Sequence, residues 1–357
     1  MNRRVYLHIG APKTGTTYLQ DRLALNAKTL SDHGVHFPTK SPLVSPGLFQ
    51  FRAALDLLDQ DWGGKAGHAH GSWDSLVRRV KRLNGTVVIS HEILAPATPA
   101  KIERAKQDLA GAELHIVYSA RDLARQLPAA WQESIKQGRK WSYARYLDRV
   151  ENRRPWFARA FDLPAVLGNW SAGLPPAQVH VVTVPHQRGE ALWLRFCQAF
   201  GIDPAWAPED STRHNVSLGV AETQLIRQLN RRMDRVTRRE ASFDELIRGM
   251  LAQDRLVQRR SGPLLLPPRM HPWATAEADR WVDWLKGSGV DVVGELDDLY
   301  PAPPVPEDEW VDPDRVGPKK QLNAAIDALS AMTREAARRP DPDDALVARI
   351  KRATRRD

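Results

Sequence analysis

The sequence predicts an α/β protein of three layers, α/β/α, with a mainly parallel sheet covered by helices on both faces and a helical C-terminal region. Four short apolar runs rich in β-branched residues are typical of strands buried on both faces. Segments with helical periodicity separate these runs, and alternating strands and helices favour a parallel sheet. The runs are VYLHIG (5–10), TVVIS (86–90), LHIVYS (114–119) and VHVVTV (179–184).

The first connection is expected to contain a helix and an edge strand. A helix over residues 16 to 31 is indicated because Leu19, Leu23, Ala27 and Leu30 recur on one helical face. VHFPT (35–39) is expected at a sheet edge, since a central strand tolerates Pro38 poorly.

Another helix is expected after the strand at 114–119. We expect Pro128 near its first position, where a missing N–H is harmless. This helix would bury Leu127, Trp131 and Ile135.

Helices dominate from Gly201 onward. One is indicated by Leu218, Ala221, Leu225 and Leu229, and a second, SFDELIRGMLAQ, by a possible cap at Ser242. PAPPVPEDEW (301–310) is typical of an extended linker. The tail after it has an apolar stripe of Leu322, Ile326, Leu329 and Met332.

We therefore expect an α/β domain over 1–235, a helical extension over 236–300, and a linker with a helical tail over 301–357.

Composition limits the classes of protein. Hydrophobic content of 42% and charged content of 27% are typical of a soluble globular chain. Cys197 is the single cysteine, which excludes an internal disulfide and a cysteine-built metal site, and no metal is expected. No segment approaches the roughly 20 apolar residues of a membrane span, so no transmembrane segment is expected. The N-terminal apolar run is too short for a secretion signal, so a cytoplasmic location is expected. A net charge of +9 favours an anionic partner.

GAPKTGTT (10–17), at the junction of the first strand and the first helix, is predicted to bind phosphate. Gly10 and Gly15 keep the P-loop spacing, but Thr16 replaces its lysine and Lys13 lies inside the loop. Loop N–H groups and the positive helix end would form an anion cradle, with hydroxyls from Thr16 and Thr17. A lysine on the loop suits a reaction without obligatory magnesium. The alternative is a glycine turn with a helix cap.

Ligands of parallel sheets bind beyond the carboxyl ends of the strands. TVVIS ends in Ser90-His91-Glu92, and His91 and Glu92 are expected to point to opposite faces. Either could accept a proton, whereas the alternatives are a salt bridge or cap for Glu92 and a structural role for His91. Arg121 follows LHIVYS and could bind an anion or pair with Asp122.

PKTGTTYLQ (12–20) resembles the 5′-phosphosulfate-binding loop of the sulfotransferase family, P-K-[ST]-G-T-[ST]. Motifs in the family's order extend over about residues 1 to 235. The resemblance implies a P-loop NTPase-like fold and 3′-phosphoadenosine 5′-phosphosulfate (PAPS) as sulfo donor. Lys13 would contact the bridging oxygen and the 5′-phosphate. The loop residues expected to bind the donor are Pro12, Lys13, Thr14, Gly15, Thr16 and Thr17.

The resemblance also implies a site for the donor's 3′-phosphate. Arg121 matches an arginine that binds this phosphate, but the serine expected eight residues later is Ala129. Gln132, Arg125 or Ser134 could compensate. HNVSLG (214–219) stands where relatives have a loop over the adenine, so Ser217 is a further candidate, with Asn215 and Arg213 nearby.

These residues predict sulfo transfer to a hydroxyl or amine by in-line displacement. Glu92 is favoured as the general base, with His91 as second choice. One rival is a P-loop kinase of a small metabolite. The other is a non-catalytic protein that binds anions or nucleic acid, although the chain lacks basic residues interleaved with aromatics, so no nucleic-acid partner is expected. The acceptor, a small molecule, glycan, lipid or peptide, would be chosen by residues 38–75, 138–160 and 236–300.

Overall fold

The computed structural model describes residues 3–40, 44–62, 64–153, 156–187, 189–211, 217–239, 243–259 and 261–338. Contacts group the chain into two compact units. The first consists of residues 1–131, 142–215 and 265–310, and the second of residues 132–141, 216–264 and 311–357. These borders differ from the predicted domains, since residues 236–300 are shared between both units. One border, between Trp310 and Val311, lies at the end of the predicted linker.

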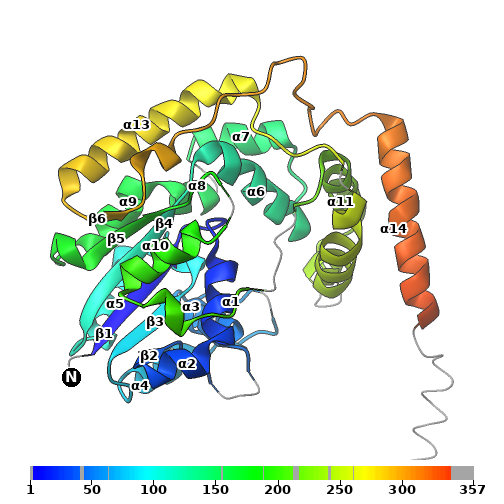
Figure 1. The fold of residues 1–357 in the computed structure, drawn as a ribbon. Coiled ribbons are helices and arrows are strands. Elements are labelled where there is room, and N and C mark those ends of the chain that lie inside the picture. Colours follow the sequence, from blue (N-terminus) through cyan, green and yellow to red (C-terminus); the bar gives the residue numbers. More distant parts are fainter. Residues whose placement is uncertain are drawn as a thin grey trace, which may run out of the picture. The chain divides into compact units, whose positions relative to one another are not determined.

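A six-stranded parallel sheet forms the centre of the first unit (Figure 1). Its order is β2-β3-β1-β4-β5-β6, and every neighbouring pair is parallel. The four predicted strands and the edge strand are all present, so the predicted fold class is confirmed. The strands are β1 (Arg4–Gly10), β2 (Val35–His36), β3 (Thr86–Ser90), β4 (Glu113–Ala120), β5 (Val179–Thr183) and β6 (Asp291–Val293).

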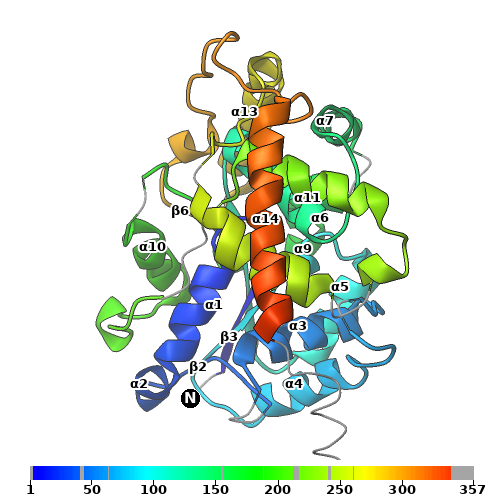
Figure 2. The ribbon, with the colours of Figure 1, turned by 90° about the vertical axis from the view of Figure 1, so that its right-hand side faces the viewer.

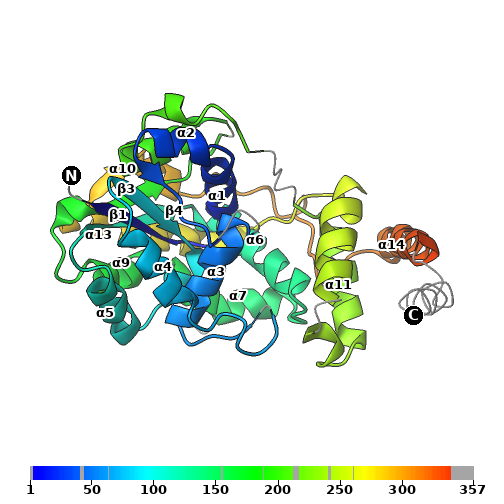
Figure 3. The ribbon, with the colours of Figure 1, turned by 90° about the horizontal axis from the view of Figure 1, so that it is seen from below.

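Helices cover both faces of the sheet (Figure 3). Alternate strand residues such as Tyr6, Val88 and Val117 pack with α1, α2 and α10 in one apolar cluster. On the opposite face, Tyr118 donates a hydrogen bond to the carbonyl of Ala160 in α8 (2.9 Å), and α9 contacts β4. Because both faces are covered, the strands read as continuous apolar runs. The helices of this unit are α1 (Thr16–Leu25), α2 (Ala27–Asp32), α3 (Pro46–Leu57), α4 (Ser72–Val80), α5 (Pro99–Asp108), α7 (Tyr143–Glu151), α8 (Trp156–Phe161), α9 (Leu163–Ser171), α10 (Ala191–Phe200) and α13 (His271–Ser288).

The helix predicted over residues 16 to 31 is divided at Asn26. The Asn26 side chain bonds to the backbone of Glu209 in both directions, at 2.8 and 3.0 Å, and this tertiary contact accompanies the end of α1. Leu19, Leu23 and Leu30 are buried as predicted.

The helix around Pro128 begins earlier than predicted. Helix α6 (Leu123–Lys136) contains Pro128 in its interior. The Asp122 carboxylate accepts the N–H of Arg125 (2.9 Å), which caps the helix well ahead of the proline. Leu127, Trp131 and Ile135 are buried as predicted.

The second unit is helical in its described part (Figure 2), and includes the C-terminal end of α6. The predicted second helix is present as the π-helix η5, while its proposed cap Ser242 lies outside the described residues. Helix α11 buries Ala221 of the predicted set together with Thr223, Ile226 and Asn230. Leu218, just before the helix, is also buried, whereas Leu225 and Leu229 are half-buried. Helix α14 buries three alanines, while Leu322, Ile326 and Leu329 are exposed. Helix α11 spans Val220–Arg232, η5 spans Asp244–Arg255, and α14 spans Pro318–Arg338.

Short 3₁₀ turns complete the described structure. They are η1 (Glu92–Leu94), η2 (Pro176–Gln178), η3 (Pro204–Trp206), η4 (Thr237–Arg239), η6 (Leu256–Arg259), η7 (Pro268–Met270) and η8 (Leu296–Leu299). Among the described helices, none combines the length and the apolar character that a membrane span needs.

Candidate functional site

The glycine-rich loop lies between the carboxyl end of the central strand β1 and the first turn of α1, as predicted. Gly10 and Gly15 have φ angles of 123° and 99°, which favour glycine. Lys13 has a φ of 67°, a left-handed conformation that costs a non-glycine residue about 1–2 kcal/mol. Strained positions of this kind concentrate at functional sites.

Four consecutive carbonyl groups of the loop each accept a hydrogen bond from a side chain. The N–H groups of the first turn of α1, in contrast, have no intrahelical acceptors. With their carbonyls occupied, the loop and the helix end present donors and positive dipole to a ligand. The pairs are Gly10 O with Ser119 Oγ (3.0 Å), Ala11 O with Thr14 Oγ1 (2.5 Å), Pro12 O with Gln126 Nε2 (2.7 Å) and Lys13 O with Arg121 Nη1 (3.0 Å).

The hydroxyl of Thr16 is buried and has no hydrogen-bond partner among the described residues. Buried polar groups are normally bonded, so this hydroxyl at the start of a helix fits an anion that would accept from it. Thr14 differs, because its hydroxyl bonds within the loop and lies 2.5 Å from Ser119 Oγ. Thr17 is exposed, and Pro12 is buried.

A buried polar cluster lies directly beneath the loop. His8 bonds through Nδ1 to Ser90 (2.8 Å) and through Nε2 to Ser119 (3.1 Å). Burial lowers the pKa of His8 to about 3, with a smaller contribution from His91. His8 is therefore neutral at pH 7, and it links β1, β3 and β4 at the point where the loop begins.

The end of β3 lies against the start of the loop. A Cβ atom on Gly10 would stand 3.2 Å from the Cα of Glu92, so these two backbones pack tightly. The Nδ1 atom of His91 accepts the N–H of Ile93 at 3.3 Å, and burial lowers the pKa of His91. A neutral His91 with an occupied Nδ1 carries its proton on Nε2 and is a hydrogen-bond donor there.

The aromatic side chain of Phe51 packs beside His91 and is followed by Trp62. The ring of Phe51 in α3 is centred 5.1 Å from the His91 ring and 5.2 Å from the Trp62 ring. Trp62 is 44% exposed. The exposed Trp62 ring could contact a flat or ring-shaped substrate.

Arg121 and Lys13, 108 positions apart in sequence, are brought together. Arg121 follows β4, and its guanidinium bonds to the Lys13 carbonyl. Asp122, proposed as its alternative partner, forms an ion pair with Arg125. Arg125 also donates to the carbonyls of Val184 (3.0 Å) and Pro185 (2.8 Å). Arg125 is therefore used in holding the end of β5, which argues against a compensating role in ligand binding.

Two of the predicted positions belong to the second unit. Gln132 donates to the Leu218 carbonyl (2.8 Å) and accepts the Leu218 N–H (3.0 Å), so its amide is structural. Ser217 is exposed just before α11, and its role stays a prediction. Ala129 is half-buried in α6. Arg213 and Asn215 lie outside the described residues, and within the described ranges no cluster of His, Cys, Asp and Glu is arranged to hold a metal ion.

Several residues that shape the site were not found from the sequence. Ser119 and His8 stand inside apolar strands, and Gln126 stands in an amphipathic helix, where polar residues are common. One sequence signal could have found them: a polar residue within a strand predicted to be buried needs a hydrogen-bond partner, so it indicates a polar contact inside the protein.

The fold is a three-layer α/β/α fold of the P-loop-like type, with a strand-loop-helix junction at its central strand. No family model and no curated protein matches the sequence. The structure is similar to a solved sulfotransferase from Alicyclobacillus acidocaldarius, with 15% identity over 67% of this chain and 98% of that chain and a TM-score of 0.38. At this identity and TM-score, the likeness supports no statement about activity.

Proposed function

We propose that this protein is a sulfotransferase that uses PAPS as sulfo donor and a hydroxyl or amine as acceptor. The observation that carries the proposal is the convergence of Lys13 and Arg121 on one loop, with a guanidinium bonded to the lysine's carbonyl at 3.0 Å. Two cations at the end of a helix suit a nucleotide with two separate anionic groups.

Each part of the loop has a role in this proposal. The N–H groups of the first turn of α1 and the hydroxyls of Thr16 and Thr17 would hold the 5′-phosphate. Lys13 would neutralise the charge that develops on the leaving oxygen, and Arg121 would bind the 3′-phosphate. The donor itself supplies a sulfo group on a stable leaving group. Since the folded loop sets the positions of these groups, catalysis would come from orientation of the donor and from electrostatic stabilisation of its leaving group.

The geometry near β3 supports Glu92 as the general base. His91 Nδ1 accepts from the backbone, so its imidazole presents a donor rather than a free lone pair. Glu92 is half-buried, and its backbone and Cβ pack against the loop at Gly10, which supports Glu92 as the group that takes the proton from the acceptor. His91 would then orient the acceptor.

The test is transfer of ³⁵S from labelled PAPS to candidate acceptor extracts. The wild-type protein should label an acceptor, and Lys13→Ala should remain folded by circular dichroism and lose most of the label. Parallel incubation with magnesium and ATP labelled at the γ-phosphate tests the kinase alternative. Phosphate transfer without sulfur transfer would overturn the proposal, as would sulfur transfer by Lys13→Ala at the wild-type rate.

A further inference from the structure

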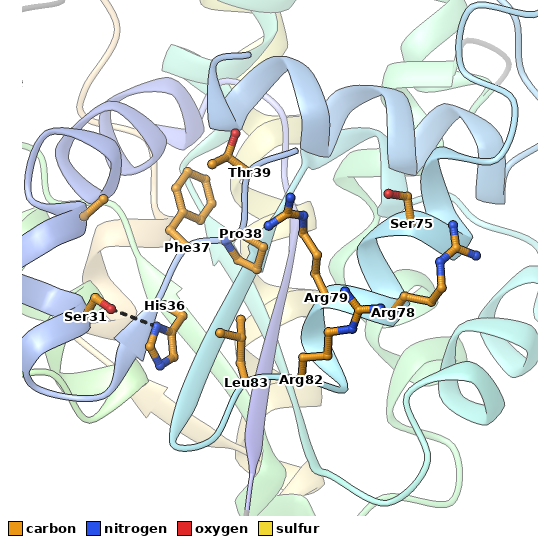
Figure 4. A pocket seen from close by; sticks show the side chains of 11 residues that line it. Ser31, His36, Phe37, Pro38, Thr39, Ser75, Arg78, Arg79, Arg82 and Leu83 are labelled. Carbon is orange, nitrogen blue, oxygen red and sulfur yellow. Dashed lines mark hydrogen bonds between the residues drawn. The ribbon is translucent and has the colours of Figure 1, made fainter. Parts of the chain in front are cut away.

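A second basic site lies beside the edge strand β2, within the first unit (Figure 4). It is a cavity of about 420 Å³, a size usual for small-molecule sites. Arg78, Arg79 and Arg82 come from α4 and the turn after it, while His36 comes from β2. None of the described residues that line the cavity is an aspartate or a glutamate.

The arginines share one side of α4. Ser75, Arg78 and Arg79 are spaced i, i+3 and i+4, which places them along one face of α4, and Arg82 follows in the turn after the helix. The adjoining face, with Trp73, Leu76 and Val80, is buried in the core. The core therefore fixes the rotation of α4 that turns the arginines toward the cavity.

The surroundings of these three arginines favour an anionic ligand. Within the described part of the chain, no carboxylate is paired with Arg78, Arg79 or Arg82. Arg79 donates to the Lys40 carbonyl, which holds it at the cavity wall. Like charges at neighbouring positions repel one another, so an anion in the cavity would relieve an existing repulsion.

Favourable interaction with the helix dipole explains part of this pattern. Cations in the last turn of a helix, here Arg78 and Arg79, are stabilised by its negative end. The dipole does not account for a cavity whose other wall carries hydroxyl and imidazole groups. Ser31 Oγ lies 3.3 Å from His36 Nδ1, and both residues line the side of the cavity opposite the arginines (Figure 4).

The walls also indicate what the rest of the ligand is. Phe37, Pro38 and Leu83 supply apolar surface between the arginines and His36 (Figure 4). Guanidinium groups match the oxygens of a phosphate or sulfate in forked pairs. We propose that this cavity binds a small phosphate or sulfate ester, with the ester group on the arginines and the carbon skeleton on the apolar wall. This site is separate from the glycine-rich loop and does not depend on the proposed sulfotransferase activity.

Calorimetric titration of the full chain tests the proposal. The probes are glucose 6-phosphate, glucose 6-sulfate and inorganic phosphate, with glucose as the neutral control. At least one ester should bind more tightly than inorganic phosphate, and glucose should not bind. Whichever ester binds identifies the anion that the site prefers.

Matched variants locate the binding. Arg78→Gln with Arg82→Gln should weaken ester binding by about tenfold or more, because bonds to charged groups are lost. Lys81→Gln removes the same charge from an exposed neighbour that does not line the cavity, and should change the affinity less than about twofold. Lys13→Ala, in the loop, should also leave this binding unchanged.

The outcomes separate the two sites. Equal affinity in the double variant and the wild type, or loss in Lys13→Ala alone, would overturn the proposal, as would failure of both esters to bind. Should the double variant unfold, Arg82→Gln alone repeats the test, since Arg82 is exposed and lies beyond the end of α4.

Discussion

The glycine-rich loop is held by side chains whose removal has a calculable effect, and Gln126 is the clearest of them. Gln126 is 1% exposed, and its Nε2 donates to the carbonyl of Pro12 at 2.7 Å. Gln126→Leu keeps much of the volume and removes the donor, which leaves a buried carbonyl unsatisfied. The expected loss of unfolding free energy is about 1–3 kcal/mol.

The same change should weaken nucleotide binding. Pro12 precedes Lys13, so release of its carbonyl frees the segment that presents the lysine. We expect a lower affinity for adenosine 3′,5′-bisphosphate, measured by calorimetry beside urea unfolding at pH 7.5. The control is Gln107→Leu, because Gln107 is exposed and its amide bonds only to the Glu103 side chain, at 3.0 Å, among the contacts described.

Two results would refute this reasoning. Gln126→Leu could match the stability of Gln107→Leu, which would mean that the buried bond contributes little. Alternatively, stability could fall while nucleotide affinity stays at the wild-type value. In that case the position of the loop would not govern binding.

Three further predictions concern the same site. His8→Gln should flatten the pH dependence of stability. Because the folded pKa of His8, about 3, lies below the ordinary value, His8 lowers the free energy of unfolding as pH falls from about 6.5 toward 3, by up to about 1.4 kcal/mol per pH unit. Urea unfolding at pH 6.0, 5.0 and 4.5 measures this slope, and an unchanged slope in the variant contradicts the prediction. Gly15→Ala and Gly111→Ala both place alanine at positive φ, 99° and 87°, and each variant should lose about 1–2 kcal/mol of unfolding free energy. Only Gly15→Ala, whose Cβ would also stand 2.7 Å from Leu192 Cδ2, should lose nucleotide affinity. Equal nucleotide affinities of the two variants would contradict the role of the loop as an anion-binding site. Glu92→Gln should lower turnover by about 10²–10⁴-fold and His91→Gln by much less, and the reverse order in a labelled-PAPS assay would assign the base to His91.

Local signals predicted most of the sheet and the loop. Buried parallel strands are apolar along their whole length, so β1, β3, β4 and β5 stood out. Glycines at fixed spacing between a strand and a helix marked the loop. Arg121 was found because it follows a strand directly, and the ends of parallel strands meet at one edge of the sheet.

The parts that were missed depend on tertiary contacts. His8, Ser90 and Ser119 come together only through the strand order β3-β1-β4, which no local pattern encodes. Pro128 suggested a helix start, but the helix is capped earlier, at Asp122, and continues through the proline. β6, with three residues, is too short to show a period of two.

In the second unit, a local pattern identified a helix but not its buried face. The apolar stripe of α14 left open whether Leu322, Ile326 and Leu329 pack against a neighbour. In the structure the small residues Ala324, Ala328 and Ala331 are buried, and the three large ones are exposed. Periodicity identifies a helix but does not say which of two apolar faces meets its neighbour.

The central claim is that one nucleotide spans Lys13 and Arg121, and a crystal structure with adenosine 3′,5′-bisphosphate tests it most directly. The account predicts one phosphate at the first turn of α1, in contact with Lys13 Nζ and Thr16 Oγ1, and the other phosphate on the Arg121 guanidinium. A nucleotide bound elsewhere, or bound with either cation turned away from it, would contradict the account.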